Sequence, residues 1–275
     1  MNVHGDYMKF KNVLFATDFD ATLTDSCGKI PQKNIDAIRY FISEGGRFTV
    51  CTGRSYLGFH LYSPEYINAP VLLSNGAAAY DYAENKLIFN DALGEECLPV
   101  LREIRDTFPN AGIEMYPFEA ARMFSINLTP FSEQHFTSQG IEFVQISDPA
   151  EAILPFTKVM IAAHGGISQA VQEVIAKHPE VNYLKTTGDF VEILKKGVDK
   201  GSGLLKLGRH LGCAEKDIYA AGDGYNDVDM LRAANAGFAP ENGSKEALAT
   251  AKYITRSNDD GCIAHAVEIL DKIYG

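Results

Sequence analysis

Short apolar runs alternate with helical patterns along the first 80 residues of the chain. Strand-like runs occupy residues 13–18, 47–52 and 71–74, and apolar residues recur at helical spacing over 35–42, just before a pair of glycines. Glycine after the last periodic residue is a typical helix stop. Alternation of strands and helices is typical of βαβ units, in which helices join parallel strands. The pattern predicts the beginning of a parallel sheet.

The pattern changes from about residue 82. Half-buried strands and amphipathic helices now follow one another without strict alternation, which indicates an α+β unit with its own sheet. Its strands are predicted at residues 87–89, 122–128, 141–144, 183–184 and 190–194, and its helices at 98–105 and 167–177.

The alternation returns after residue 197. Helices are predicted at 200–211 and 226–233, and strands at 218–221, 237–238 and 253–254. The fold class that follows is α/β, with a Rossmann-like parallel-sheet core interrupted by an inserted α+β cap domain. We expect the core to comprise residues 1–82 and 190–275, and the cap to comprise residues 83–189.

Composition and charge limit the partners of the protein. A formal net charge of −11 over 275 residues disfavours nucleic acid and anionic membranes, since both reward a basic surface. The five cysteines are scattered without a CxxC spacing, which indicates neither a disulfide framework nor a zinc site. No apolar stretch resembles a signal peptide or reaches the roughly 20 residues that span a bilayer. We expect a cytoplasmic globular protein.

Two carboxylates follow the first apolar run. Asp18 and Asp20 are two residues apart, and side chains at this spacing on an extended segment point the same way. Ionising two neighbouring carboxylates is unfavourable, because they repel each other, unless a cation or a shared proton lies between them. Magnesium takes oxygen ligands and is commonly held by one or two carboxylates together with substrate phosphate. The pair therefore predicts a Mg²⁺ site.

Three further polar motifs follow strands or open a helix. Thr52 and Gly53 follow the second strand, and a hydroxyl, a glycine amide and a helix start together can cradle a phosphate. Lys200 opens a helix, where its ammonium could neutralise a carboxylate and a phosphoryl oxygen. Asp223 and Asp227 follow the strand at 218–221 and bring two more acids. Sites at the carboxyl ends of parallel strands are the rule in such folds.

These four motifs, in this order, resemble those of the haloacid dehalogenase-like phosphohydrolases. The position of the cap and the run at 258–264 are similar to the Cof-type subfamily with an α+β (C2-type) cap. The resemblance implies a Mg²⁺-dependent phosphatase that acts on a small soluble phosphomonoester, either a sugar phosphate or a phosphorylated cofactor, through an aspartyl-phosphate. At position 21, where many members carry glycine, this chain has Ala21.

The resemblance also implies a role for each residue. Asp18 would be the nucleophile, and Asp20 the general acid and base. The metal would be held by the carboxylates of Asp18 and Asp223 and the backbone carbonyl of Asp20, with Asp227 in the outer shell. The phosphate-binding residues would be Thr52, Gly53, Lys200 and Asn226.

Other interpretations stay open. An aspartate pair after a strand is by itself more often a solvated turn, and only its conjunction with the other motifs favours chemistry. Arg54 could reach the substrate or form a surface ion pair, and Asn75 with Gly76 indicates a turn. A phosphomutase on the same core and a non-catalytic phosphate-sensing protein are the alternative functions. Candidate cap contacts to the substrate are Tyr116, Phe118, Arg122 and Phe124.

Overall fold

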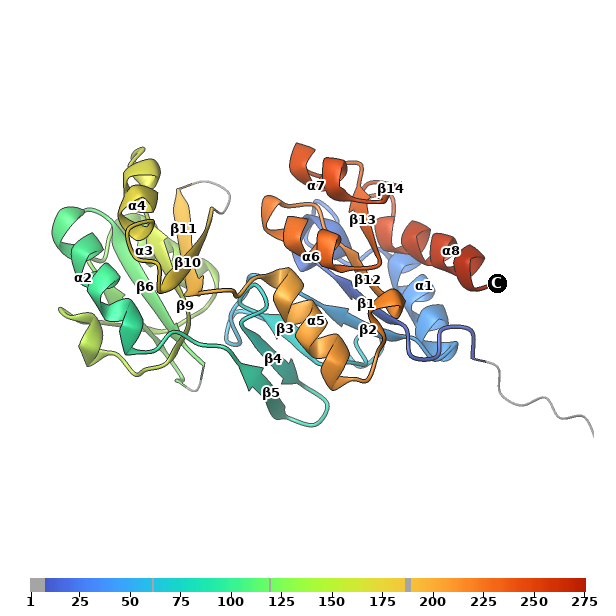
Figure 1. Ribbon diagram of the computed structural model, residues 1–275. Helices are drawn as coiled ribbons and strands as arrows, with labels where there is room; N and C mark the ends of the chain where they lie inside the picture. The colour runs from blue at the N-terminus through green and yellow to red at the C-terminus, as the bar shows by residue number, and fades with distance from the viewer. Residues whose placement is uncertain (1–7, 61, 119, 186–188) are drawn as a thin grey trace, which may run out of the picture.

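The structure is a computed structural model, and it describes residues 8–60, 62–118, 120–185 and 189–275. Its strands form three sheets, of five, six and three strands (Figure 1). The five-stranded sheet lies between helices, and the six-stranded sheet belongs to a second body joined to the first by two chain crossings. The predicted α/β class, a parallel-sheet core with an additional α+β unit, is confirmed.

The core sheet is entirely parallel, in the order β14-β13-β12-β1-β2. Its strands are β1 (Leu14–Thr17), β2 (Arg47–Val50), β12 (Ile218–Ala221), β13 (Ala236–Pro240) and β14 (Tyr253–Thr255). Strand β1 is buried throughout because both of its faces are covered: Phe15 packs into one hydrophobic cluster, and Leu14 with Ala16 packs into another.

Helices cover both faces of this sheet. On one face, α1 (Gln32–Ser43) packs against α8 (Cys262–Tyr274), and on the other α5 (Lys200–His210) packs against α6 (Val228–Ala233), with α7 (Lys245–Thr250) beside it. The result is a three-layer sandwich in which every loop after a strand of the central sheet reaches the same edge.

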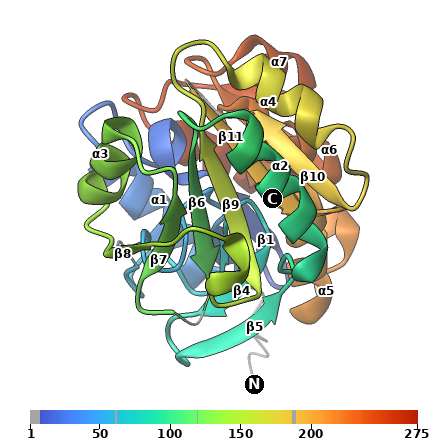
Figure 2. The same ribbon diagram turned by 90° about the vertical axis from the view of Figure 1, so that its left-hand side faces the viewer.

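The six-stranded sheet has the order β10-β11-β9-β6-β7-β8, and only its β7–β8 pair is parallel. Its strands are β6 (Gly112–Pro117), β7 (Met123–Ile126), β8 (Phe143–Gln145), β9 (Phe156–Ala162), β10 (Val181–Lys185) and β11 (Phe190–Lys195). Two helices, α2 (Leu98–Thr107) and α4 (Ser168–Ile175), lie on its outer face, and α3 (Pro130–Ser138) lies nearer the β8 edge (Figure 2).

The third sheet is an antiparallel meander of β3 (Val71–Leu73), β4 (Ala78–Asp81) and β5 (Lys86–Asn90). A parallel bridge between Cys51 and Leu72 joins it to the end of β2. The assignment of 87–89 to the sheet of the insertion is therefore wrong: the turn at 82–85 folds β5 back on β4, and a short hairpin is a closer partner than a distant strand.

The division into core and cap stays a proposal. Strand pairing bears on its boundaries, since β5 continues the sheet that begins in the core and β11 pairs with β9 and β10 of the six-stranded sheet. We now favour boundaries near residues 91 and 196 over 83 and 189. No helix in the described part of the chain is long and apolar enough to cross a membrane.

Candidate active site

Three loops carrying the predicted site residues meet at the carboxyl edge of the core sheet. Asp18 follows β1, Thr52 lies just beyond β2, and Asp223 lies just beyond β12. A cavity of about 720 Å³ separates this edge from the six-stranded sheet. Its core side is lined by Asp18, Asp20, Ala21, Thr52, Gly53, Arg54, Gly58, His60, Asn75, Asp223, Gly224 and Asn226.

The loop after β1 is a tight turn over Phe19–Leu23. The amide of Asp18 donates to the carbonyl of Ala221 at 2.8 Å, which ties the turn to β12. Ala21 has φ 59° and ψ 8°, the left-handed region that glycine occupies at no steric cost, so this turn carries strain that a glycine would avoid. The hydroxyl of Thr22 donates to Oδ1 of Asp223 at 2.5 Å and so connects two of the acidic loops.

Lys200 is the first residue of α5 and is fully buried. Its Nζ donates to Oδ1 of Asp18 at 2.5 Å and to Oδ1 of Asp227 at 2.6 Å. Burial alone would lower the pKa of this ammonium, but the two carboxylates outweigh burial and raise its pKa. The lysine is therefore a permanent positive charge behind the acids.

Oxygens of Asp18, Asp223 and Asp227 lie within 4.8 Å of one another. Burial raises the pKa of Asp18 well above its ordinary value, and the nearby Asp227 adds to this while Lys200 opposes it. Burial also raises the pKa of Asp223, against the hydrogen bond from Thr22. Three crowded carboxylates with one ammonium leave negative charge that a further cation would relieve. Hard oxygen donors of this kind suit Mg²⁺.

Asp20 takes a different position from Asp18. Its carboxylate is largely exposed and receives two hydrogen bonds from Arg54, from Nε at 3.0 Å and from one terminal nitrogen at 2.7 Å. The Arg54 guanidinium also lies 5.1 Å from the centre of the Phe19 ring. Of the two possibilities for Arg54, the structure shows an ion pair, and this pair lies in the wall of the cavity.

The remaining predicted residues also line the cavity or support it. The hydroxyl of Thr52 accepts from the amide of Arg54 at 3.1 Å, and Gly53 follows it in the same loop. Asn226 donates through its side chain to Oδ1 of Asn75 at 3.1 Å. Asn75 belongs to the expected turn, with φ 53°, yet its side chain also borders the cavity.

The cap side of the cavity is where sequence reasoning was wrong. None of the four candidate cap contacts is among the described residues that line it: Tyr116 and Phe124 are buried in the cap, while Phe118 packs on an aromatic cluster of the core. The wall instead comprises His135, Ser138, Gln139, Lys158, Met160, Phe190 and Glu192. The signal that could have found two of them is a charged residue inside an apolar strand run, at 158 and at 192.

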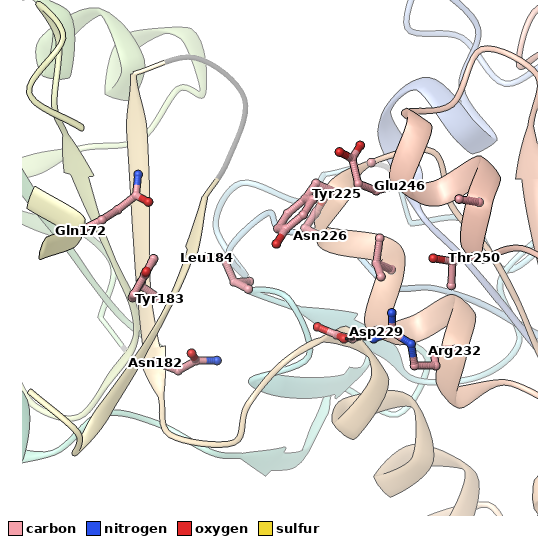
Figure 3. Close-up of a pocket in the computed structure, with 13 residues that line it drawn as sticks. Gln172, Asn182, Tyr183, Leu184, Tyr225, Asn226, Asp229, Arg232, Glu246 and Thr250 are labelled. Carbon is pink, nitrogen blue, oxygen red and sulfur yellow. Dashed lines mark hydrogen bonds and ion pairs between the residues drawn. The ribbon is translucent and has the colours of Figure 1, made fainter. Parts of the chain in front are cut away.

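A second cleft lies on the other side of the loop after β12 (Figure 3). Its volume is about 1160 Å³, and Gly224 and Asn226 border both cavities. Tyr225 and Asn226 face Gln172, Asn182 and Tyr183 of the six-stranded body across it. It is the larger of the two, but Asp18 and Thr52 are not among the described residues that line it, whereas both line the smaller cavity.

The chain belongs to the haloacid dehalogenase-like hydrolases, whose family profile matches residues 15–267. It is similar to the protein YxeH of Bacillus subtilis, with 27% identity over 94% of this chain and 97% of that protein. It is 25% identical to the 5-amino-6-(5-phospho-D-ribitylamino)uracil phosphatase YbjI of Escherichia coli, over 94% and 95% of the two chains. A haloacid dehalogenase-like hydrolase from Bacteroides thetaiotaomicron superposes with a TM-score of 0.80 at 26% identity, covering 94% of this chain and 99% of that one.

Proposed function

We propose that the protein is a Mg²⁺-dependent phosphatase that hydrolyses a small soluble phosphomonoester through an aspartyl-phosphate on Asp18. The observation that carries the proposal is the Asp18 carboxylate at the cavity floor, held by a buried lysine and grouped with two further acids. Membership of a hydrolase family and similarity to a phosphatase of Escherichia coli support the same reaction. The five unpaired cysteines support a cytoplasmic location.

The acidic cluster fits the predicted metal. Asp18 and Asp223 would hold Mg²⁺ through their carboxylates and Asp20 through its backbone carbonyl, with Asp227 in the outer shell. When bound, the ion would offset the negative charge of the phosphate and of the attacking carboxylate. Asp227 already accepts from Lys200 and from the amide of Gly224, so its oxygens are engaged by the protein as an outer-shell partner requires.

The first chemical step would use the two acids of the first loop. The Asp18 carboxylate attacks phosphorus, the bond from phosphorus to the ester oxygen breaks, and Asp20 delivers a proton to the leaving oxygen. Thr52, the Gly53 amide, Lys200 and Asn226 hold the oxygens of the transferring group. Asp20 needs a proton for this role, so its ion pair with Arg54 has to open beforehand.

The second step would return the enzyme to its starting state. Asp20, now ionised, takes a proton from a water molecule, and the resulting hydroxide attacks phosphorus on Asp18. The bond between phosphorus and the Asp18 oxygen breaks, which releases inorganic phosphate and restores the carboxylate. The six-stranded body limits the access of other water to the cavity during the first step.

The test is phosphate release from p-nitrophenyl phosphate with and without Mg²⁺, in wild type and Asp18→Asn. We expect release only with the metal, and a loss of at least about a thousandfold in the variant because the amide is a poor nucleophile. Asp36→Asn, the same change at an exposed position of α1, is the matched control. Equal rates in wild type and Asp18→Asn would overturn the nucleophile assignment, and no turnover of a broad phosphate panel would favour a phosphate-sensing protein.

A further inference from the structure

Charged side chains are buried on the face of the six-stranded sheet that looks toward the cavity. Side chains alternate between the two faces of a strand. In β9, Val159 and Ile161 pack under the outer helices, which leaves Lys158 and Met160 on the inner face. In β11, Val191 and Ile193 pack outward in the same way and Glu192 faces inward.

One carboxylate oxygen of Glu192 is free to accept a hydrogen bond. The residue is 2% exposed, and its Oε2 accepts from the side-chain amide of Asn75 at 2.9 Å. Its Oε1 is buried and receives no hydrogen bond from the described part of the chain; the nearest cation, Nζ of Lys158, is 3.5 Å away. A buried carboxylate oxygen without a donor is costly, so the site favours a ligand that brings one.

Lys158, next to Glu192, offers hydrogen-bond donors. It is 5% exposed, and its Nζ donates to the carbonyl of Gly53 at 2.7 Å, across the cavity from its own strand. An ammonium has three N–H donors, and only this one hydrogen bond uses them among the contacts described, so donors remain for a ligand. Lys158 and Glu192 together carry no net charge.

A second group of polar side chains, centred on Glu114 and His135, holds the same wall in place. Glu114 is fully buried, and its Oε2 contacts the hydroxyl of Tyr116 and Nδ1 of His135, each at 2.7 Å. The His135 ring centre lies 4.5 Å from that of Phe190 with the two planes tilted by 44°, and Nε2 of His135 lies 2.6 Å from the amide nitrogen of Gln139. The wall therefore offers an apolar surface beside a fixed set of polar groups.

We propose that Lys158 and Glu192 determine leaving-group specificity by binding hydroxyl groups of an uncharged polyhydroxylated leaving group and disfavouring an anionic one. This rests on the proposed phosphatase function, since it assigns the half of the cavity opposite Asp18. A hydroxyl both donates and accepts, so one hydroxyl can donate to Glu192 while another accepts from Lys158. A carboxylate on the leaving group would lie against Glu192, and like charges in a desolvated site repel each other.

A hydrogen-bond chain connects this pair to the reacting end of the site. Glu192 accepts from Asn75, and Asn75 accepts from Asn226 of the loop that carries Asp223. Lys158 likewise holds the carbonyl of Gly53 in the predicted phosphate loop. A leaving group bound to Lys158 and Glu192 would therefore also affect the loop that carries Gly53 and the loop that carries Asp223.

The test compares two probes that differ only at the far end of the same carbon chain: glucitol 6-phosphate, which is uncharged there, and 6-phosphogluconate, which carries a carboxylate. Their dissociation constants are measured by calorimetry with Mg²⁺ in the Asp18→Asn protein, which removes turnover. We expect glucitol 6-phosphate to bind at least about tenfold more tightly. A ratio near one, or a preference for the carboxylate, would overturn the proposal.

Two variants made in the Asp18→Asn protein should shift the ratio of the two dissociation constants in opposite directions. Glu192→Gln removes the repelling charge and leaves Lys158 unbalanced, so we expect the preference to fall to about threefold or less; Lys158→Met leaves Glu192 uncompensated, so we expect it to rise. Loss of structure alone would not give opposite shifts. Glu142→Gln, the same change at an exposed cap position, should leave the ratio unaltered. If neither Glu192→Gln nor Lys158→Met changed this ratio, Lys158 and Glu192 would not be the residues that select the leaving group.

Phosphate release by the wild-type protein separates this inference from the proposed function. Release of phosphate from p-nitrophenyl phosphate with an unaltered binding ratio in both variants would retain the phosphatase and reject the specificity pair. Absence of release with the predicted opposite shifts would reject the phosphatase and retain the hydroxyl-binding wall.

Discussion

Replacement of Lys200 by methionine tests the electrostatic arrangement on which the site depends. The change keeps an unbranched side chain, shorter by one heavy atom, and removes its charge. Asp18 and Asp227, whose oxygens lie 2.5 and 2.6 Å from Nζ, would then face each other in a buried position without a cation. The main perturbation is thus the loss of one charge at the centre of the acidic cluster.

The distances set the scale of the effect. At an effective dielectric constant of about 20, an ammonium and a carboxylate at this separation attract each other by roughly 6 kcal/mol. Desolvation of the lysine offsets much of the two contacts, and removal of one partner from a buried pair typically costs about 3–5 kcal/mol. We expect the free energy of unfolding to fall by that amount in metal-free buffer.

The assay is urea unfolding followed by circular dichroism, with Lys206→Met as the control. Lys206 lies on the same helix, 2.5 Å from a carboxylate oxygen of Asp91 and 4.3 Å from the Phe89 ring centre, but its side chain is 39% exposed. An exposed ion pair and a cation–π contact are each worth up to about 1 kcal/mol, so this variant should lose at most about 2 kcal/mol.

Magnesium provides a second readout of the same reasoning. The variant retains three carboxylates and lacks their ammonium, so Mg²⁺ should bind it more tightly and raise its stability more than that of wild type. Phosphate release should nevertheless stay at least about a hundredfold lower, since a transition-state donor is absent. If Lys200→Met lost no more stability than Lys206→Met and gained no more from the metal, the electrostatic reasoning would be refuted.

Two further predictions concern packing and pH. Gly203→Ala should destabilise the protein by about 1–3 kcal/mol despite the better helix propensity of alanine, because its Cβ would lie 2.6 Å from the Cα of Gly76; a higher melting temperature would contradict this. Burial alone would lower the pKa of His178, but hydrogen bonds with Glu103 and Glu180 outweigh burial and raise it. Its stabilising contribution is therefore complete below the unfolded pKa of about 6.5 and lost as pH rises through the higher folded value. The stability gap between wild type and His178→Gln, from urea unfolding at pH 6 to 9, should close with rising pH; a gap that widens would count against the ion pairs.

Sequence pattern determined much of the core because the information there is local. The apolar run before Asp18 predicts a buried strand, and βαβ alternation makes the strands parallel, so their carboxyl ends share one edge. That rule alone was enough to expect Asp18, Thr52 and Asp223 at one place, and the structure puts all three on one cavity. The function of each remains a proposal drawn from family resemblance and chemistry.

Tertiary structure decided the opposite wall of the cavity. Strands β6 and β9 at the centre of the six-stranded sheet were not predicted, since runs such as 156–162 mix apolar residues with a lysine and carry no clear period. Whether Lys158 or Glu192 is a surface charge or a buried binding group depends on which strands and helices flank it, and those neighbours lie far away in sequence. The pairing of Arg54 with Asp20 is likewise a contact between loops. Local pattern gives the positions of the reacting acids, whereas the groups that face the leaving group are defined only when separate segments pack together.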